Sequence, residues 1–245
     1  MTSTPAQFAR FRIINETRHC LAEGCNKFRK RTSRFCNTHT RTNTFWGHPL
    51  AKHIPTPTLD LYRFMFDQFV GRHADTEQVK LALELCTRLI QEGLPQDLPK
   101  WRVKQMYWTR GDVDHRLEDL KALDVTGREV LVAAGGAWLL ARREPRLLQD
   151  DMRLTYRLGA EIFKTRQFPV RLTSHGNLKP HPPGTMPRRS VGKYIRRHLG
   201  VFFERVCQGI DAEQQHAIDQ DATLSSEFNV TTATPTPPLE RTPTP

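Results

Sequence analysis

Three cysteines and one histidine lie within twenty residues of one another near the N-terminus. They are Cys20, Cys25, Cys36 and His39, in the spacing C-x4-C-x10-C-x2-H. Three thiolates and one imidazole complete a tetrahedral zinc shell, at about 2.3 Å for sulfur and about 2.0 Å for nitrogen. A shell made only of protein ligands leaves no position for a reacting water molecule. The pattern therefore predicts one structural Zn²⁺ ion per chain, with His19 and His48 as alternative sources of the imidazole.

The segment around the predicted ligands is rich in cationic and aromatic side chains. Residues 10–53 contain ten Lys or Arg and two acids, which gives a net charge of +8. Such cations bind phosphates and release condensed counterions, and aromatic rings stack on unpaired bases. The residues expected to contact nucleic acid are Lys27, Arg29, Lys30, Arg31, Arg34, Arg41 and Trp46. Phe28 and Phe35, in contrast, are expected to form a small core that supports the metal site.

The run from Cys20 to Leu50 resembles short zinc modules found near the N-termini of phage and mobile-element proteins, some of which are attached to HNH endonucleases. Besides the metal ligands, the matching features are Gly24, Phe35, Arg41 and the run Trp46-Gly47-His48-Pro49-Leu50. The corresponding run of the family reads His-Gly-Asp-Pro, so this chain departs from the pattern there. The resemblance covers roughly forty of the 245 residues. It implies a nucleic-acid setting rather than a particular activity.

The charge of the rest of the chain is unevenly distributed. The net charge is +11, of which residues 179–206 carry +6 and residues 54–178 only +2, while residues 207–245 carry −5. The second basic zone indicates a helix that contacts a phosphate backbone, with a solvated face of a core helix as an equal alternative. Its expected nucleic-acid contacts are Arg188, Arg189, Lys193, Arg196 and Arg197.

Hydrophobic periodicity predicts a mainly α protein, with a multi-helix domain after the zinc module. The segment 126–143 is apolar almost all round and is expected at the centre, with Gly135-Gly136 packed closely against another helix. Other helices are predicted over 59–70, 74–92, 112–123, 147–166 and 190–209, a helix or strand over 100–109, and a loop or extended arm over 167–187. The predicted organisation is a flexible lead at 1–17, the zinc-binding basic module at 18–53, the helical domain at 58–210 and a disordered Thr/Pro-rich tail at 222–245.

No catalytic residues are predicted. The best cluster of acids and bases is Asp112, Asp114, His115, Glu118 and Asp119. Asp112 and Asp114 are expected instead to cap the helix over 112–123, because carboxylates stabilise a helix N-terminus. Cys86 and Cys207 are expected to be buried hydrophobic residues, which fits the reducing cytoplasm of a bacterial cell. The longest apolar run has about a dozen residues, fewer than the roughly 20 that span a bilayer, so no membrane partner is expected.

The preferred hypothesis is a non-enzymatic, zinc-dependent nucleic-acid-binding protein of a phage or mobile element, with DNA favoured over RNA. The alternative is a protein-interaction or assembly component, in which zinc is purely structural and the helices pack against partner subunits or other copies of the chain. A third hypothesis is a divergent nuclease that uses Asp114 or His115. The preferred hypothesis predicts that binding to nucleic acid weakens steeply as salt rises, because the protein contacts phosphates.

Overall fold

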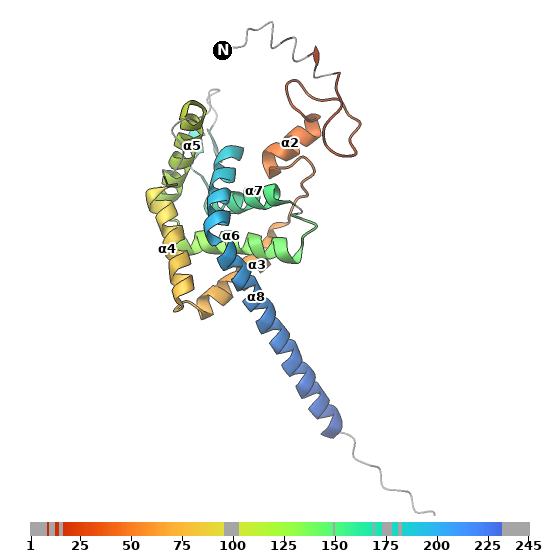
Figure 1. The fold of residues 1–245 in the computed structure, drawn as a ribbon, viewed down its shortest axis with the longest axis vertical. Helices are drawn as coiled ribbons and strands as arrows, with labels where there is room; N and C mark the ends of the chain where they lie inside the picture. Colours follow the sequence, from red (N-terminus) through yellow and green to blue (C-terminus); the bar gives the residue numbers. More distant parts are fainter. Residues whose placement is uncertain are drawn as a thin grey trace, which may run out of the picture. The chain divides into compact units, whose positions relative to one another are not determined.

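The computed structural model describes residues 9, 13–14, 17–95, 103–148, 150–168, 170–172, 178–180 and 183–231. Within them it contains seven α-helices and one two-stranded antiparallel sheet, so the predicted mainly α fold is confirmed (Figure 1). The helices are α2 (Asn37–Trp46), α3 (Thr56–Arg72), α4 (Glu77–Glu92), α5 (Val103–Ala122), α6 (Gly127–Arg143), α7 (Asp151–Ile162) and α8 (Thr185–Thr231). The strands are β1 (Val170–Leu172) and β2 (Leu178–Pro180), in the segment predicted as a loop or extended arm. The chain divides into two compact units, with the boundary between Cys207 and Gln208.

The helix α6 lies at the centre of the first unit, as its sequence predicts. It packs against α3, α4 and α7, and buried residues occupy most of its circumference. Thr126 caps its N-terminus: the Thr126 hydroxyl accepts from the amide of Glu129 at 3.2 Å, and the Glu129 carboxylate accepts from the amide of Thr126 at 2.9 Å. This reciprocal pair satisfies two amides that the helix itself leaves unbonded.

Glycines allow neighbouring helices to approach closely. A Cβ added to Gly136 would lie 2.8 Å from Arg63 Cα of α3, so the expectation that Gly135-Gly136 packs against another helix is confirmed. The tightest crossing joins α7 to α8, where a Cβ added to Gly192 would lie 1.7 Å from the carbonyl oxygen of Thr155. Backbone atoms cannot rotate aside as a side chain can, so this crossing requires glycine.

The helix α5 begins earlier than expected. It starts at Val103 and includes most of the segment that was compatible with either a strand or a helix. Asp112 and Asp114 therefore lie inside α5, and the prediction that they cap its N-terminus is wrong. Asp112 and Asp119 instead lie 3.5 and 3.1 Å from the guanidinium of Arg116, whose side chain is only 4% exposed. Their spacing places the two carboxylates on the same helical face as this buried cation.

The bounds of α7 and α8 also differ from the expected ones. α7 begins at Asp151 because the carboxylate of Asp150 caps it, accepting from the amide of Arg153 at 2.6 Å. α8 begins at Thr185 and continues past the expected stop at Gly209.

Residues 222–231, which were expected to belong to the Thr/Pro-rich tail, are helical, and residues 232–245 lie outside the described part of the chain. No proline occurs between Gly209 and Pro235, and a single glycine weakens a helix by only about 1 kcal/mol relative to alanine. In the described residues, no helix combines the length and apolar character needed to cross a bilayer.

We expect Gly192→Ala to lower the free energy of unfolding by about 1–3 kcal/mol, because the new methyl group would meet the Thr155 carbonyl. Gly111→Ala in α5 is the matched control, since no atom lies within 4 Å of a Cβ added there. That change should be neutral or stabilising by up to about 1 kcal/mol, the intrinsic helical preference of alanine over glycine. Urea unfolding followed by circular dichroism measures both, and a Gly192→Ala protein as stable as the parent would contradict the close crossing.

Candidate metal centre and basic module

Residues 18–29 form a small hairpin that carries the first two metal ligands. The amide of Cys20 donates to the carbonyl of Lys27 at 2.8 Å and closes the hairpin. Gly24 lies in the turn with φ of +70°, a conformation that glycine adopts without a Cβ clash. The hairpin therefore brings Cys25 back towards Cys20 despite the four residues between them.

A second turn and the start of α2 supply the other two ligands. The amide of Lys30 donates to the carbonyl of Phe35 at 3.1 Å, and Arg31 at the turn adopts a left-handed φ of +51°. Cys36 follows as the N-cap residue of α2, so His39 lies in the first turn of that helix. Residues three apart at the start of a helix share a face, which places both ligands on the same side.

The four ligand atoms lie close enough to share one ion. His39 Nδ1 lies 3.4 Å from Cys20 Sγ and 3.5 Å from Cys36 Sγ. The Sγ atoms of Cys25 and Cys36 are 3.9 Å apart, and all four ligand atoms lie within 4.8 Å of one another. Tetrahedral bonds of the usual zinc lengths require separations of about 3.6–3.8 Å, so these residues fit a closed four-coordinate metal site. Among the described residues, no other group of three or more His, Cys, Asp or Glu side chains is placed to hold an ion.

His39 supplies the imidazole of this cluster, and the two alternatives serve elsewhere. His19 Nδ1 lies 3.1 Å from the carbonyl oxygen of Asn26 in the first hairpin. His48 Nδ1 lies 2.6 Å from the guanidinium of Arg153 on α7. Of the three imidazoles that the sequence leaves open, the cluster therefore uses that of the C-x2-H pair, His39.

The backbone around Cys20 favours the charged form of its sulfur. Burial alone would raise the pKa of this thiol, but the amides of Cys36 and Ala22 donate to Sγ at 3.2 and 3.5 Å. Together with His39, these donors lower the pKa of Cys20 to about 6. Because a metal binds the thiolate rather than the thiol, the fold prepares this ligand for a cation.

The end of α2 docks against α7 and α8 of the helical domain. Gly47 ends α2 with φ of +74°, and an added Cβ would lie 2.4 Å from Tyr156 Cγ. The Tyr156 hydroxyl donates to the carbonyl of Thr44 at 3.4 Å, and Arg189 donates to the carbonyl of Gly47 at 3.0 Å. The module is thus held by packing and by hydrogen bonds to two helices.

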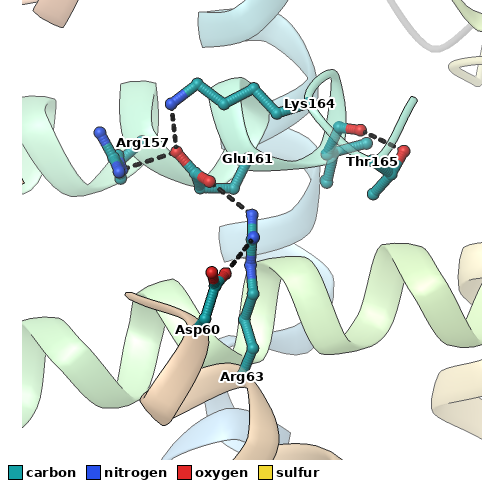
Figure 2. A network of polar contacts seen from close by, with 7 residues as sticks. Asp60, Arg63, Arg157, Glu161, Lys164 and Thr165 are labelled. Atoms are coloured by element: carbon teal, nitrogen blue, oxygen red, sulfur yellow. Dashed lines mark hydrogen bonds and ion pairs between the residues drawn. The ribbon is translucent and has the colours of Figure 1, made fainter. Parts of the chain in front are cut away.

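A buried carboxylate shared by three cations lies at this interface. Glu161 is 1% exposed and accepts from Arg63 of α3 at 2.5 Å. The same carboxylate pairs with Arg157 at 2.8 Å and Lys164 at 2.9 Å (Figure 2). Arg157 and Lys164 also lie 5.8 and 5.7 Å from the centre of the Trp46 ring. Trp46, predicted as a nucleic-acid contact, is therefore engaged by cations of the helical domain.

Most of the module's predicted phosphate contacts are exposed. The exposed members are Lys27, Lys30, Arg31, Arg34 and Arg41. Arg29 is half-buried, and its Nε donates to the carbonyl of His19 at 2.8 Å. Arg18 is exposed as well and was not among the predicted contacts. Its place two residues before the first ligand is the signal that could have identified it.

The second basic zone is used mainly inside the protein. Its half-buried members, each bonded to α2 or α7, are Arg188, Arg189 and Arg196. Arg196, for example, pairs with Asp151 at 2.7 Å. Lys193 and Arg197 are exposed and remain predicted contacts. The zone therefore combines helix-packing arginines with a smaller exposed set.

The two phenylalanines expected to support the metal site lie in different surroundings. Phe35 is half-buried and packs against the buried cysteines of the cluster, as predicted. Phe28 is 58% exposed, so the prediction that it belongs to the module's core is wrong. Its ring stacks on His19, with ring centres 4.9 Å apart and an angle of 21° between the planes. The two rings meet because His19 and Phe28 face each other across the hairpin, which local spacing alone does not reveal.

No protein-family model, no curated protein and no solved structure matches this chain. The phage or mobile-element setting therefore stays a prediction.

His48 acts as a hydrogen-bond acceptor where the module meets α7. Its Nδ1 accepts from the amide of Leu50 at 3.1 Å and from Arg153 at 2.6 Å. Burial and the charge of Arg153 lower the pKa of His48, and Asp150, 3.7 Å from Nε2, opposes the shift. The folded protein therefore holds His48 in the neutral form, with its proton on Nε2.

We expect the protein to lose stability as the pH falls through about 6.5, the ordinary pKa of histidine. Because the pKa of His48 is lower in the folded than in the unfolded state, the stability that it contributes is present above pH 6.5 and is lost below it. His48→Gln retains an acceptor oxygen but does not titrate, so it separates this effect from protonation of the metal ligands. Urea unfolding between about pH 5 and pH 8 measures both proteins, and identical pH dependence would contradict the expected role of His48.

Proposed function

We propose that the chain holds a Zn²⁺ ion at Cys20, Cys25, Cys36 and His39, and that the folded module binds the phosphate backbone of nucleic acid. The observation that carries this proposal is a closed four-ligand site built by two turns that expose a dense set of cations. A closed set of thiolate and imidazole ligands is typical of structural zinc. The ion would neutralise the thiolates and hold both turns in place.

The charge balance of the module favours a polyanionic partner. Glu23 is the only acid among residues 17–53, whereas the exposed cations come from the hairpin, the second turn and α2. Repulsion among these cations is relieved when they bind phosphates, where they replace the counterions condensed on the nucleic acid. Cations held on a metal-organised loop also lose less conformational freedom on binding than cations on a disordered segment. DNA is the expected partner.

A catalytic role has less support than binding. Asp114 and His115 lie in the middle of α5, and His115 pairs with Glu118 of the same helix at 3.8 Å. Among the described residues, these side chains do not belong to a group that could hold an ion. The proposed metal site has no open position for a substrate. The proposal therefore assigns no reaction to the chain.

We expect Cys25→Ser to reduce the zinc content from one ion per chain to a small fraction of that value. The ordered structure of the module should be lost while α3–α8 remain folded, because the metal supplies most of the folding energy of such a module. Metal analysis, the visible spectrum of the cobalt-substituted protein and far-ultraviolet circular dichroism measure this. Chelator-treated parent protein is the control and should match the variant. A variant that keeps a full equivalent of zinc would contradict the ligand assignment.

We expect the triple change Arg18→Gln, Lys27→Gln and Arg34→Gln to weaken DNA binding and to reduce the slope of log affinity against log salt by about 2–3. The matched control is Lys80→Gln, Arg88→Gln and Arg128→Gln, which removes the same charge from exposed positions of the helical domain. Fluorescence anisotropy over a range of salt concentrations measures both. Equal losses for the two triple variants would indicate a general charge effect, and salt-independent binding by the parent would contradict phosphate contacts altogether.

A further inference from the structure

An aromatic pair, His19 and Phe28, lies on the first hairpin with both side chains exposed to solvent. The two residues face each other across an antiparallel bridge, and their rings stack at 4.9 Å. Phe28 remains 58% exposed and His19 is also exposed. A buried phenylalanine supplies a large hydrophobic stabilisation, which a module with a very small core gives up by leaving this ring in water. The fold uses this ring for a cross-strand stack and leaves much of the side chain accessible to a ligand.

Cationic residues neighbour this aromatic pair in the sequence on both strands of the hairpin. Arg18 precedes His19, while Lys27 and Arg29 flank Phe28. The amide of Arg29 donates to the carbonyl of Arg18 at 2.9 Å, so these two residues lie opposite each other next to the rings. The Nε of Arg29 is fixed on the carbonyl of His19 at 2.8 Å, which holds a guanidinium close to the pair. Aromatic rings and positive charge thus occur together on one hydrogen-bonded hairpin.

We infer that the His19–Phe28 pair is a stacking platform for an unpaired base, and that the preferred ligand of the module is single-stranded nucleic acid. Bases within a duplex are stacked on one another, whereas unpaired bases expose their faces and stack on aromatic side chains while nearby cations follow the backbone. This inference rests on the proposed function and narrows its ligand from nucleic acid to unpaired strands.

The structure also distinguishes this platform from the aromatic residue that the sequence favoured for stacking. Trp46 lies against Arg157, Lys164 and His53 and is engaged within the protein. Phe28 belongs instead to the hairpin that carries the exposed Arg18 and Lys27. Stacking by Phe28 needs no particular base, because every base has an aromatic face, so binding should depend little on sequence.

The test uses the full-length, zinc-loaded protein with a short single-stranded DNA and with the duplex of the same sequence. We expect Phe28→Ala to weaken binding of the single strand by about 5- to 150-fold, the usual effect of removing one stacked base, and to leave duplex binding within about twofold. Phe28→Tyr should keep the single-strand affinity. Leu21→Ala is the matched control, since Leu21 is a 60% exposed apolar residue of the same hairpin that cannot stack. A 2-aminopurine base in the strand should lose fluorescence on binding to the parent but not to Phe28→Ala.

Metal content and circular dichroism confirm that each variant retains the fold. If Phe28→Ala binds the single strand as tightly as the parent while Arg18→Gln, Lys27→Gln and Arg34→Gln weaken binding, the platform is wrong and the proposed phosphate contacts stand. If Leu21→Ala and Phe28→Ala have equal effects, the loss is a general effect of apolar surface and the platform is again wrong. If neither DNA binds at low salt, the proposed function fails together with the inference.

Discussion

The carboxylate of Glu161 connects parts of the protein that lie far apart in the sequence. Its two oxygens receive Arg63 from α3 and the cations of Arg157 and Lys164. Removing one partner from a buried set of charges leaves the others uncompensated, at a cost of about 3–5 kcal/mol. The same two cations, Arg157 and Lys164, adjoin Trp46 at the end of the zinc module. One buried negative charge therefore links α3 to α7 and supports the position of the module.

The basic residues of this chain serve two purposes: some hold the zinc module against the helical domain, and others are exposed to solvent. Arg189 fixes the carbonyl of Gly47, and Arg188 binds Tyr156, so these arginines orient the module on the helical domain. The proposed metal folds the module, while α7 and α8 determine where it is held. Lys27 and Arg34 are exposed to solvent on the module that these contacts hold. A basic stretch in the sequence thus contains residues that hold the structure and residues that can meet a partner.

Features that depend on local spacing are predictable from the sequence of this chain. The metal cluster follows from its C-x4-C-x10-C-x2-H spacing, and the start of α6 from the capping box at Thr126. Features that depend on contacts between distant segments are not predictable in this way. The exposure of Phe28 depends on a cross-strand stack, and the engagement of Arg188 on a helix more than twenty residues earlier in the sequence. The position of Asp112 is a further case, because its carboxylate lies inside α5 beside the buried Arg116 rather than at a helix end.

The burial of Cys86 and Cys207 gives the chain two chemically different kinds of thiol. Both are fully buried within α4 and α8, and burial raises the pKa of Cys86 to about 12, so that sulfur is a very poor nucleophile at neutral pH. The sulfur of Cys20, with a pKa of about 6, is already ionised there. The thiolate form, which metals and electrophiles require, is therefore favoured at Cys20 and disfavoured at Cys86. Oxidation of Cys20 would remove one ligand of the proposed metal site, whereas the sulfur of Cys86 is protected by burial in its protonated form.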